Sequence, residues 1–353
     1  VLAVFPDQVK HVHTTRTPAF LGLDVKGGLW PKSDFGSEVI VGILDTGIWP
    51  ESRSFDDAGL GPTPSRWKGA CEGTKDFPTN LCNRKIVGAQ YFVRGNEALN
   101  GPINETIESR SARDTDGHGT HTASTVAGVY VENAGLFGYA TGVAKGLAPK
   151  ARIAAYKVCW SMGCFDSDIL AGFDRAVSDG VDVISLSIGG EISSLDIDTI
   201  AIGAFGAMSH GIFVSASGGN MGPSPASVTN LAPWITTVGA STLDRTFPAN
   251  VILGNNRTSL PGVSLYSGPA LPHATLFPLA DARDLGFKLN AADPNSSTDD
   301  YESTSTLCMS GSLDPVLAKG KIMLCQRGGN TRTAKGAEVR RAGGVGMILM
   351  NSE

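Results

Sequence analysis

Short, unbroken apolar runs recur along the first two thirds of the chain, with helix-like segments between them. The runs are Val39–Leu44, Arg152–Cys159, Val181–Ile188 and Ile212–Ser217. A strand of a parallel sheet is buried on both faces, so it reads as a continuous apolar run rather than an alternating one. These four runs therefore predict parallel strands.

Two segments between these runs have the spacing of helices. After Asp166-Ser167-Asp168, which we expect to cap a helix, apolar residues recur at helical spacing up to Val177. Ile197–His210 is a second such segment, ended by Gly211. Strands that alternate with helices predict an α/β fold, with a parallel sheet covered by helices on both faces.

Polar residues with possible chemistry follow three of the predicted strands. Asp45 comes directly after the first run, Ser187–Gly190 closes the third, and Asn220 lies in a glycine-flanked loop after the fourth. In open parallel sheets the ligand crevice lies outside the carboxyl ends of the strands. We therefore expect these residues to meet at one edge of the sheet.

Two other parts of the chain lack the regular alternation of apolar runs and helix-like segments. Gly69–Gly101 holds few periodic runs and is predicted to be surface loop. After about Asn250 the alternation gives way to a Pro-, Asp- and Ser-rich stretch, 261–306, which is followed by a helical pattern over 333–342 and an apolar strand over 345–350. This change predicts a separate region in the last hundred or so residues.

The stretch Arg113–Gly128, RDTDGHGTHTASTVAG, concentrates reactive side chains at the predicted start of a helix. It places His118 between glycines, with Asp114 and Asp116 before it and His121 after it. Glycine costs conformational entropy, so this spacing indicates a backbone forced close to something else. Histidine suits a general base because its pKa lies near 6.5.

Three motifs in this order resemble the subtilisin-like serine peptidases, in particular their plant, cucumisin-like branch. They are ILDTG around Asp45, DGHGTH around His118 and SGGNMG around Asn220, and the resemblance extends from about Val1 to the last residue. In that family the catalytic groups occur in the order Asp, His, Ser. The resemblance implies that Asp45 and His118 are triad members and that Asn220 is the oxyanion-hole side chain.

The same resemblance implies further roles. Ser187, Ile188 and Gly189 resemble the edge that pairs with an extended substrate backbone. The family's serine lies in a G-T-S-M-like motif, which does not occur in these residues. The implied protein is therefore a fragment of an endopeptidase that lacks its nucleophile and is inactive by itself, with polypeptides as substrates and no cofactor.

The resemblance also divides the chain. Residues 1–13 correspond to the end of an inhibitory propeptide, the parent enzyme's own inhibitor, with His13–Thr14 as the processing bond; without the family, a simple edge strand explains them equally well. Residues 14–255 correspond to an incomplete catalytic domain. Residues 256–353 correspond to a linker and part of a protease-associated domain.

The composition of the chain argues against some classes of binding partner. The chain has 353 residues, of which 41% are hydrophobic and 18% charged, and a net charge of −5 that is not concentrated in any block. This argues against nucleic acid or an anionic membrane as a partner. No apolar run approaches the ~18 residues of a membrane span. The chain starts without methionine or a charged-then-apolar leader, and we expect both ends of the parent protein to be missing.

Cysteines and glycosylation motifs indicate an oxidising compartment. The six cysteines form three local pairs: Cys71 with Cys82, Cys159 with Cys164, and Cys308 with Cys325. We favour disulfides over free thiols, and zinc is less favoured because the spacing does not match a zinc site. Sequons occur at Asn104, Asn256 and Asn295. Together they predict a secreted glycoprotein of the apoplast or cell wall.

Alternatives stay open at this point. ILDTG is also an aspartic-peptidase signature, but those enzymes need two such aspartates and this chain has one. His118 and His121 could form a metal pair, although a third ligand is not evident; we prefer His121 as a packed or hydrogen-bonded residue. Asp114 and Asp116 are nearer to His118 in sequence than Asp45 and could be mistaken for the triad acid; we prefer a solvated or capping role for them.

The rival function is a non-catalytic subtilase scaffold that binds a peptide or protein. The presence of Asp45, His118 and Asn220 together argues against it, since a degenerate scaffold should have lost one of them. Calcium binding of the EF-hand kind is not indicated.

Overall fold

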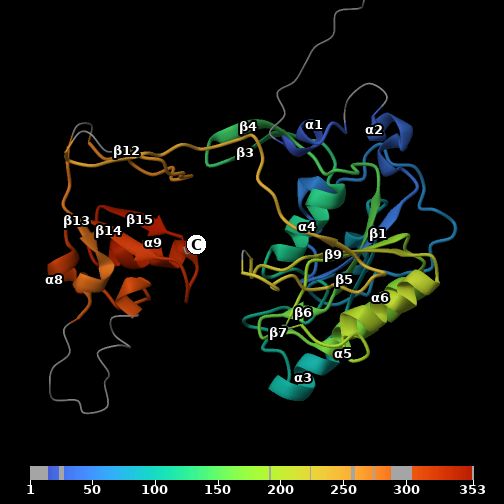
Figure 1. Ribbon diagram of the computed structural model, residues 1–353. Coiled ribbons are helices and arrows are strands. Elements are labelled where there is room, and N and C mark those ends of the chain that lie inside the picture. Colours follow the sequence, from blue (N-terminus) through green and yellow to red (C-terminus); the bar gives the residue numbers. More distant parts are fainter. Residues whose placement is uncertain are drawn as a thin grey trace, which may run out of the picture. The chain divides into compact units, whose positions relative to one another are not determined.

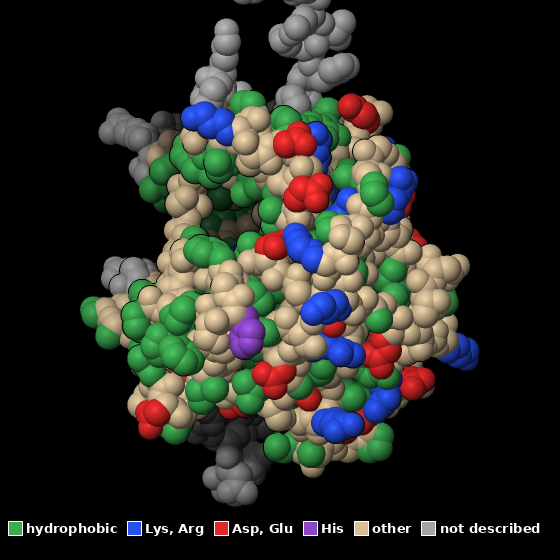
Figure 2. All heavy atoms as spheres, turned by 90° about the vertical axis from the view of Figure 1, so that its right-hand side faces the viewer, with side chains coloured by type: hydrophobic (Ala, Val, Ile, Leu, Met, Phe, Trp, Pro, Cys, Tyr) green, Lys and Arg blue, Asp and Glu red, His purple; other side chains and the backbone are tan. Residues whose placement is uncertain are grey.

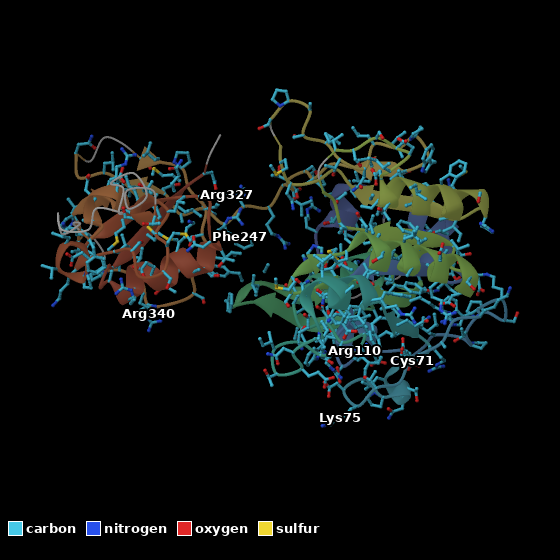
Figure 3. All side chains as sticks on the ribbon, turned by 90° about the horizontal axis from the view of Figure 1, so that it is seen from below. Cys71, Lys75, Arg110, Phe247, Arg327 and Arg340 are labelled. Carbon is cyan, nitrogen blue, oxygen red and sulfur yellow. A yellow bond between two sulfur atoms is a disulfide. The ribbon has the colours of Figure 1, made fainter. Side chains whose placement is uncertain are left out.

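A computed structural model describes residues 15–23, 28–190, 192–222, 224–255, 259–272, 275–287 and 304–351 of the chain. The chain divides into two compact units, Val1–Phe247 and Pro248–Glu353; Phe247 is labelled in Figure 3. The expected propeptide segment, 1–13, lies outside the described residues, as do Asn256 and Asn295.

The first unit is built on a six-stranded parallel sheet in the order β10-β9-β8-β1-β5-β2. Its strands are β1 (Ile40–Asp45), β2 (Ile86–Tyr91), β5 (Arg152–Lys157), β8 (Val183–Leu186), β9 (Phe213–Ser217) and β10 (Thr236–Val238). The predicted parallel α/β fold is confirmed, and each of the four apolar runs contains a strand of this sheet.

Helices cover both faces of the sheet (Figure 1). They are α4 (His118–Ala127), α5 (Asp166–Asp179) and α6 (Thr199–Ser209). Because side chains alternate along a strand, Ile40 and Leu44 of β1 join the core layer beneath α5 and α6. Val41 and Ile43 join the layer beneath α4. The unbroken apolar run of β1 thus fills two separate core layers.

The prediction that Gly69–Gly101 is surface loop is wrong. This stretch contains β2 and the helix α3 (Arg94–Asn100). Ile86–Gln90 is buried throughout, and β2 pairs with β5 as the edge strand of the sheet. A six-residue strand that ends in Gln90 and Tyr91 gives too short an apolar signal to stand out among the turn residues before it.

The expectation that Asp166-Ser167-Asp168 caps its own helix is also wrong. The N-cap of α5 is Phe165, without a side-chain cap. Asp168 is buried and accepts hydrogen bonds from Gly95 N (2.9 Å) and Asn96 N (3.0 Å), in the first turn of α3. An acidic side chain at the start of one helix therefore caps a different helix. The sequence does not reveal this, because the two helices are far apart along the chain.

Smaller elements complete the first unit. They are the short helices α1 (Thr17–Phe20) and α2 (Leu29–Lys32), the β3 (Val131–Leu136) and β4 (Tyr139–Ala144) hairpin, and the β6 (Cys159–Trp160) and β7 (Gly163–Cys164) hairpin.

The second unit contains a three-stranded parallel sheet in the order β13-β14-β15. Its elements are the β11 (Val251–Ile252) and β12 (Ser259–Leu260) hairpin, β13 (Leu279–Asp281), α8 (Pro315–Ala318), β14 (Ile322–Gln326), α9 (Arg332–Arg341) and β15 (Gly346–Met350). The core of this unit holds Met323 and Val339 together with the bonded cysteines Cys308 and Cys325. The helix and strand predicted near the chain's end are both present.

Charges of both signs are mixed on the face shown in Figure 2, where basic and acidic side chains lie close together. This matches the mild, dispersed charge of the sequence. Within the described ranges, no helix combines the length and apolarity that crossing a bilayer requires.

Candidate active site

The carboxyl end of β1 and the start of α4 bring two predicted residues into contact. His118 Nδ1 lies 2.6 Å from Asp45 Oδ1, although the residues are 73 positions apart. Asp45 is 2% exposed, whereas the His118 side chain is 48% exposed. The carboxylate is thus shielded and the imidazole is accessible, which is the arrangement a solvent-facing base with a buried partner requires.

Two threonines donate to the Asp45 carboxylate and fix its position. Thr46 N donates to Asp45 Oδ1 at 2.8 Å, and Thr122 Oγ1 donates to Asp45 Oδ2 at 3.1 Å. Sequence reasoning did not single out either threonine. The signal was present: Thr46 follows the aspartate in ILDTG, and Thr122 comes one helical turn after His118 in GHGTHT.

The first turn of α4 is capped by side chains, because the opening amides of a helix have no partner within it. His118 N donates to Asp116 Oδ1 (3.2 Å), Gly119 N donates to Thr46 Oγ1 (2.8 Å), and Thr120 N donates to Asp114 Oδ2 (2.8 Å). The backbone that carries His118 is therefore held in place at the start of its helix.

Asp114 is the centre of this network. It is 3% exposed, and it accepts hydrogen bonds from the hydroxyls of Thr46 and Thr120 and from the amides of Asp116, Gly117 and Thr120. Its carboxylate ties the residue after Asp45 to the helix that carries His118. Asp114 thus has a capping role, and it is buried rather than solvated.

Gly119, directly after His118, is explained by a close approach of two backbones, whereas Gly117 before it has open space around it and a φ of +106°. A Cβ on Gly119 would lie 2.3 Å from Gly47 O, and a Cβ on Gly47 would lie 2.5 Å from Ala112 O. Gly47 also has φ +113°, a conformation that favours glycine. The neighbour that the backbone was expected to approach is therefore the turn that follows Asp45.

The charge environment favours the protonated form of His118. Burial lowers the pKa of the imidazole, but the hydrogen bond to Asp45 and the negative charges of Asp45, Asp116 and Asp114 outweigh it and raise the pKa above its ordinary value. An imidazole with a raised pKa accepts a proton more readily, which suits a general base.

The remaining predicted residues lie at neighbouring strand ends. β1 and β8 are paired up to Leu44 and Leu186, and β8 and β9 up to Leu186 and Ala216. Asp45 and Ser187 are therefore the next residues of adjacent strands. Ile188, Gly189 and the exposed Asn220 follow just beyond these ends. The carboxyl edge of the sheet thus collects all the predicted groups except His118, which α4 supplies.

His121 is exposed, so of its two expected roles, packed or hydrogen-bonded, the packed one is wrong. Over the part of the chain that the structure describes, groups of three or more His, Cys, Asp or Glu side chains that could hold a metal ion are not found. Of the two histidines considered as a metal pair, His118 already has its Nδ1 hydrogen-bonded to Asp45.

All six cysteines are bonded, in the pairs Cys71–Cys82, Cys159–Cys164 and Cys308–Cys325. The first sequon is exposed, and Asn104 Oδ1 accepts hydrogen bonds from Thr106 N (3.1 Å) and Thr106 Oγ1 (2.7 Å).

Comparison with known proteins gives one consistent result. The model of the subtilase family matches residues 36–341. The chain is 59% identical to subtilisin-like protease SBT1.5 of Arabidopsis thaliana over 353 residues, which is 99% of this chain and 44% of the relative. It is 56% identical to subtilisin-like protease SBT1.6 of the same plant over 356 residues, 99% of this chain and 44% of that one. The chain thus spans less than half the length of these curated relatives.

Proposed function

This chain belongs to the subtilase family, and on that premise we propose that it is the front portion of a plant serine endopeptidase that cleaves polypeptides through an acyl-enzyme. The observation that carries the proposal is the 2.6 Å contact between His118 Nδ1 and Asp45 Oδ1. It pairs an accessible base with a buried carboxylate at the edge of the sheet where ligands of α/β folds bind.

The geometry defines what the pair does. A carboxylate only accepts hydrogen bonds, so Nδ1 of neutral His118 carries the hydrogen that it shares with Asp45, and Nε2 keeps its lone pair. Nε2 then takes the proton of a serine hydroxyl as the hydroxyl attacks the scissile carbonyl, and returns it to the leaving amine. Asp45 stabilises the imidazolium between these steps.

Asn220 is proposed as the side-chain donor to the oxygen that gains charge in the tetrahedral intermediate. In subtilisin, a member of the same family, removal of such a donor costs ~10²–10³-fold in turnover. Ser187, Ile188 and Gly189 are proposed to pair with the extended substrate backbone as an added strand. Their position at the end of β8, next to β9 and its following loop, supports this role.

The nucleophile is proposed to lie outside these residues. A G-T-S-M-like motif does not occur in the sequence, and the chain covers 44% of its relatives. We therefore propose that the 353-residue chain by itself does not turn over peptides.

Three further expectations belong to the same proposal. Residues 1–13 are the tail of the enzyme's own inhibitory propeptide, and residues 256–353 hold part of a protease-associated domain. The protein is secreted to the apoplast or cell wall. Three bonded cysteine pairs support an oxidising compartment, and the exposed Asn104 sequon supports glycosylation.

The proposal is tested by labelling the full-length native protein with a fluorophosphonate and mapping the label by mass spectrometry. We expect a label on a serine outside residues 1–353, lost in His118→Ala and retained in His121→Ala, a matched exposed histidine on the same helix. A folded protein that binds peptide but takes no label would overturn the proposal in favour of a non-catalytic binding scaffold.

A further inference from the structure

A buried asparagine joins the ends of the two strands that lead to the proposed substrate and oxyanion residues. Asn230 is 6% exposed. Its Nδ2 donates to Ile188 O and to Ser217 O, both at 2.9 Å. Both hydrogens of the side-chain amide are thus used on the backbone of two different strand ends.

These contacts lie where the sheet stops holding the two segments together. The last paired residues of β8 and β9 are Leu186 and Ala216. Ile188 and Ser217 follow that pair, so the Asn230 amide links the two segments beyond the end of the backbone ladder. One side-chain group therefore links the edge Ser187–Gly189 to the segment that runs into Asn220.

The neighbouring residue fills the space between the same two segments. Thr229 is 8% exposed, and its Oγ1 is buried without a hydrogen-bond partner among the described residues. A Cβ on Gly189 would lie 2.8 Å from this oxygen, and a Cβ on Gly219 would lie 3.0 Å from it. Thr229 N also donates to Gly218 O at 3.2 Å. Thr229 therefore limits how closely the two glycine-containing segments approach.

The Thr229–Asn230 pair is itself held in place. Thr237 Oγ1, on β10, donates to Asn230 O. Asn230 has φ +57°, a left-handed conformation that asparagine tolerates better than most residues. The pair is thus attached to β8, β9 and β10 together, rather than to one flexible loop.

We propose that Asn230 is a positioning residue that, with Thr229, sets the distance between the peptide-binding edge Ser187–Gly189 and the oxyanion side chain Asn220. This inference rests on the proposed function. The edge binds the substrate residues before the scissile bond, and Asn220 binds the oxygen of that bond. Because this separation is fixed, a substrate whose backbone binds along the edge has its reacting carbonyl placed next to Asn220.

The expected effect follows from that coupling. Binding energy from remote substrate residues raises turnover only when it positions the reacting bond, and a misplacement of about 1 Å costs roughly 10²-fold. Loss of the two hydrogen bonds from the Asn230 side chain, which we call the clamp, should therefore reduce kcat/KM for an extended tetrapeptide amide by about 10- to 100-fold. A single-residue ester, which does not use the edge, should lose much less.

The test uses the full-length protein and two variants of Asn230. Asn230→Asp keeps the size and the tolerance for positive φ, but it turns a carboxylate oxygen toward the two carbonyl oxygens. Asn230→Gly keeps the backbone conformation, removes the clamp without repulsion, and decides the matter if Asn230→Asp does not fold. Asn83→Asp is the matched control, because Asn83 Nδ2 donates to Phe55 O (3.0 Å) before β2, at the opposite end of the strands from the site.

Kinetics are normalised to active sites titrated with a fluorophosphonate, at a temperature where each variant is folded. We expect the kcat/KM advantage of the tetrapeptide over the ester to collapse in the Asn230 variants and to persist in Asn83→Asp. An unchanged advantage in a folded Asn230 variant refutes the inference, even if its Tm is lower. A wild-type protein that takes no label refutes the proposed function instead.

Discussion

Replacing Asp114 by Asn removes one charge from the centre of the site's hydrogen-bond network and changes little else. With its oxygen in the place of Oδ1, the asparagine keeps the contacts from Thr46 Oγ1 (2.9 Å), Gly117 N (2.8 Å) and Asp116 N (3.1 Å). Its NH₂ group then takes the place of Oδ2 and faces Thr120 N, a donor 2.8 Å away. The Thr120 hydroxyl can rotate to accept.

One buried amide is therefore left without an acceptor, which costs about 1–3 kcal/mol. Loss of a negative charge at the start of α4 adds ~0.3–1 kcal/mol. We expect Asp114→Asn to lower the free energy of unfolding by about 1–4 kcal/mol and Tm by roughly 3–16 °C. Asp116→Asn is the control: its oxygen keeps the 3.2 Å contact with His118 N, so it loses only a charge near the start of α4 and should cost less than about 1 kcal/mol.

The pH dependence separates this mechanism from a general packing defect. Burial raises the pKa of Asp114, but hydrogen bonds from Thr120, Gly117 and Thr46 outweigh it and lower the pKa below its ordinary value. A carboxyl with a lowered folded pKa adds stability that is complete above its unfolded pKa of about 3.9 and is lost as the pH falls through the folded value. Asparagine does not titrate.

The stability gap between wild type and Asp114→Asn should therefore narrow as the pH is lowered below about 4. Thermal unfolding of the chain, followed by circular dichroism at about pH 7 and at a series of acidic pH values, measures this gap. A gap under about 0.5 kcal/mol at neutral pH, within the range of ordinary surface substitutions, would show that Asp114 is not the centre of the network. A gap that is constant with pH would show that its charge is not involved.

Three other changes test the site and its support. Gly119→Ala would place a Cβ 2.3 Å from Gly47 O, so α4 has to move; we expect loss of fluorophosphonate labelling of the full-length protein, and normal labelling would contradict the close approach. Asp45→Asn removes the main influence that raises the pKa of His118, so the imidazole pKa measured by NMR should fall; an unchanged value would show that Asp45 does not set it. Burial lowers the pKa of Lys85 to about 7, and the unfolded chain therefore binds the extra proton between that pH and about 10.4. The free energy of unfolding of the wild type should rise with pH across this window relative to that of Lys85→Met. A difference between the two proteins that does not change with pH would refute the lowered pKa of Lys85.

The strands and the motif residues could be predicted because their signals are local. Val39–Leu44 is apolar throughout, since β1 is covered on both faces, and Asp45 follows it directly. The glycines next to His118 likewise indicated a close contact, which the structure shows at Gly119, against the turn at Gly47, and not at Gly117. These signals depend on residues that lie within a few positions of one another.

The partners of the polar side chains could not be predicted, because they depend on tertiary distance. Asp168 begins α5 but caps α3, more than seventy residues earlier. Asp114 and Asp116 are both close to His118 in the motif, yet only Asp114 is buried and bonded to the segment after Asp45. Asn230 lies outside the helices and strands, and its role is visible only once β8 and β9 are placed side by side.

The strand order has a consequence for how the chain is made. β1 pairs only with β5 and β8 in the described sheet, and β2 pairs only with β5. The first register pair of β1 joins Ile40 to Arg152. On a ribosome, β1 and β2 therefore both emerge before any strand of this sheet with which they pair, although β2 already bridges to Cys71 just before it. Contacts of such long sequence separation fold slowly and leave apolar strands open to aggregation meanwhile. Substitutions in β5 should thus affect the yield of folded protein more than equivalent changes in the strands that precede it.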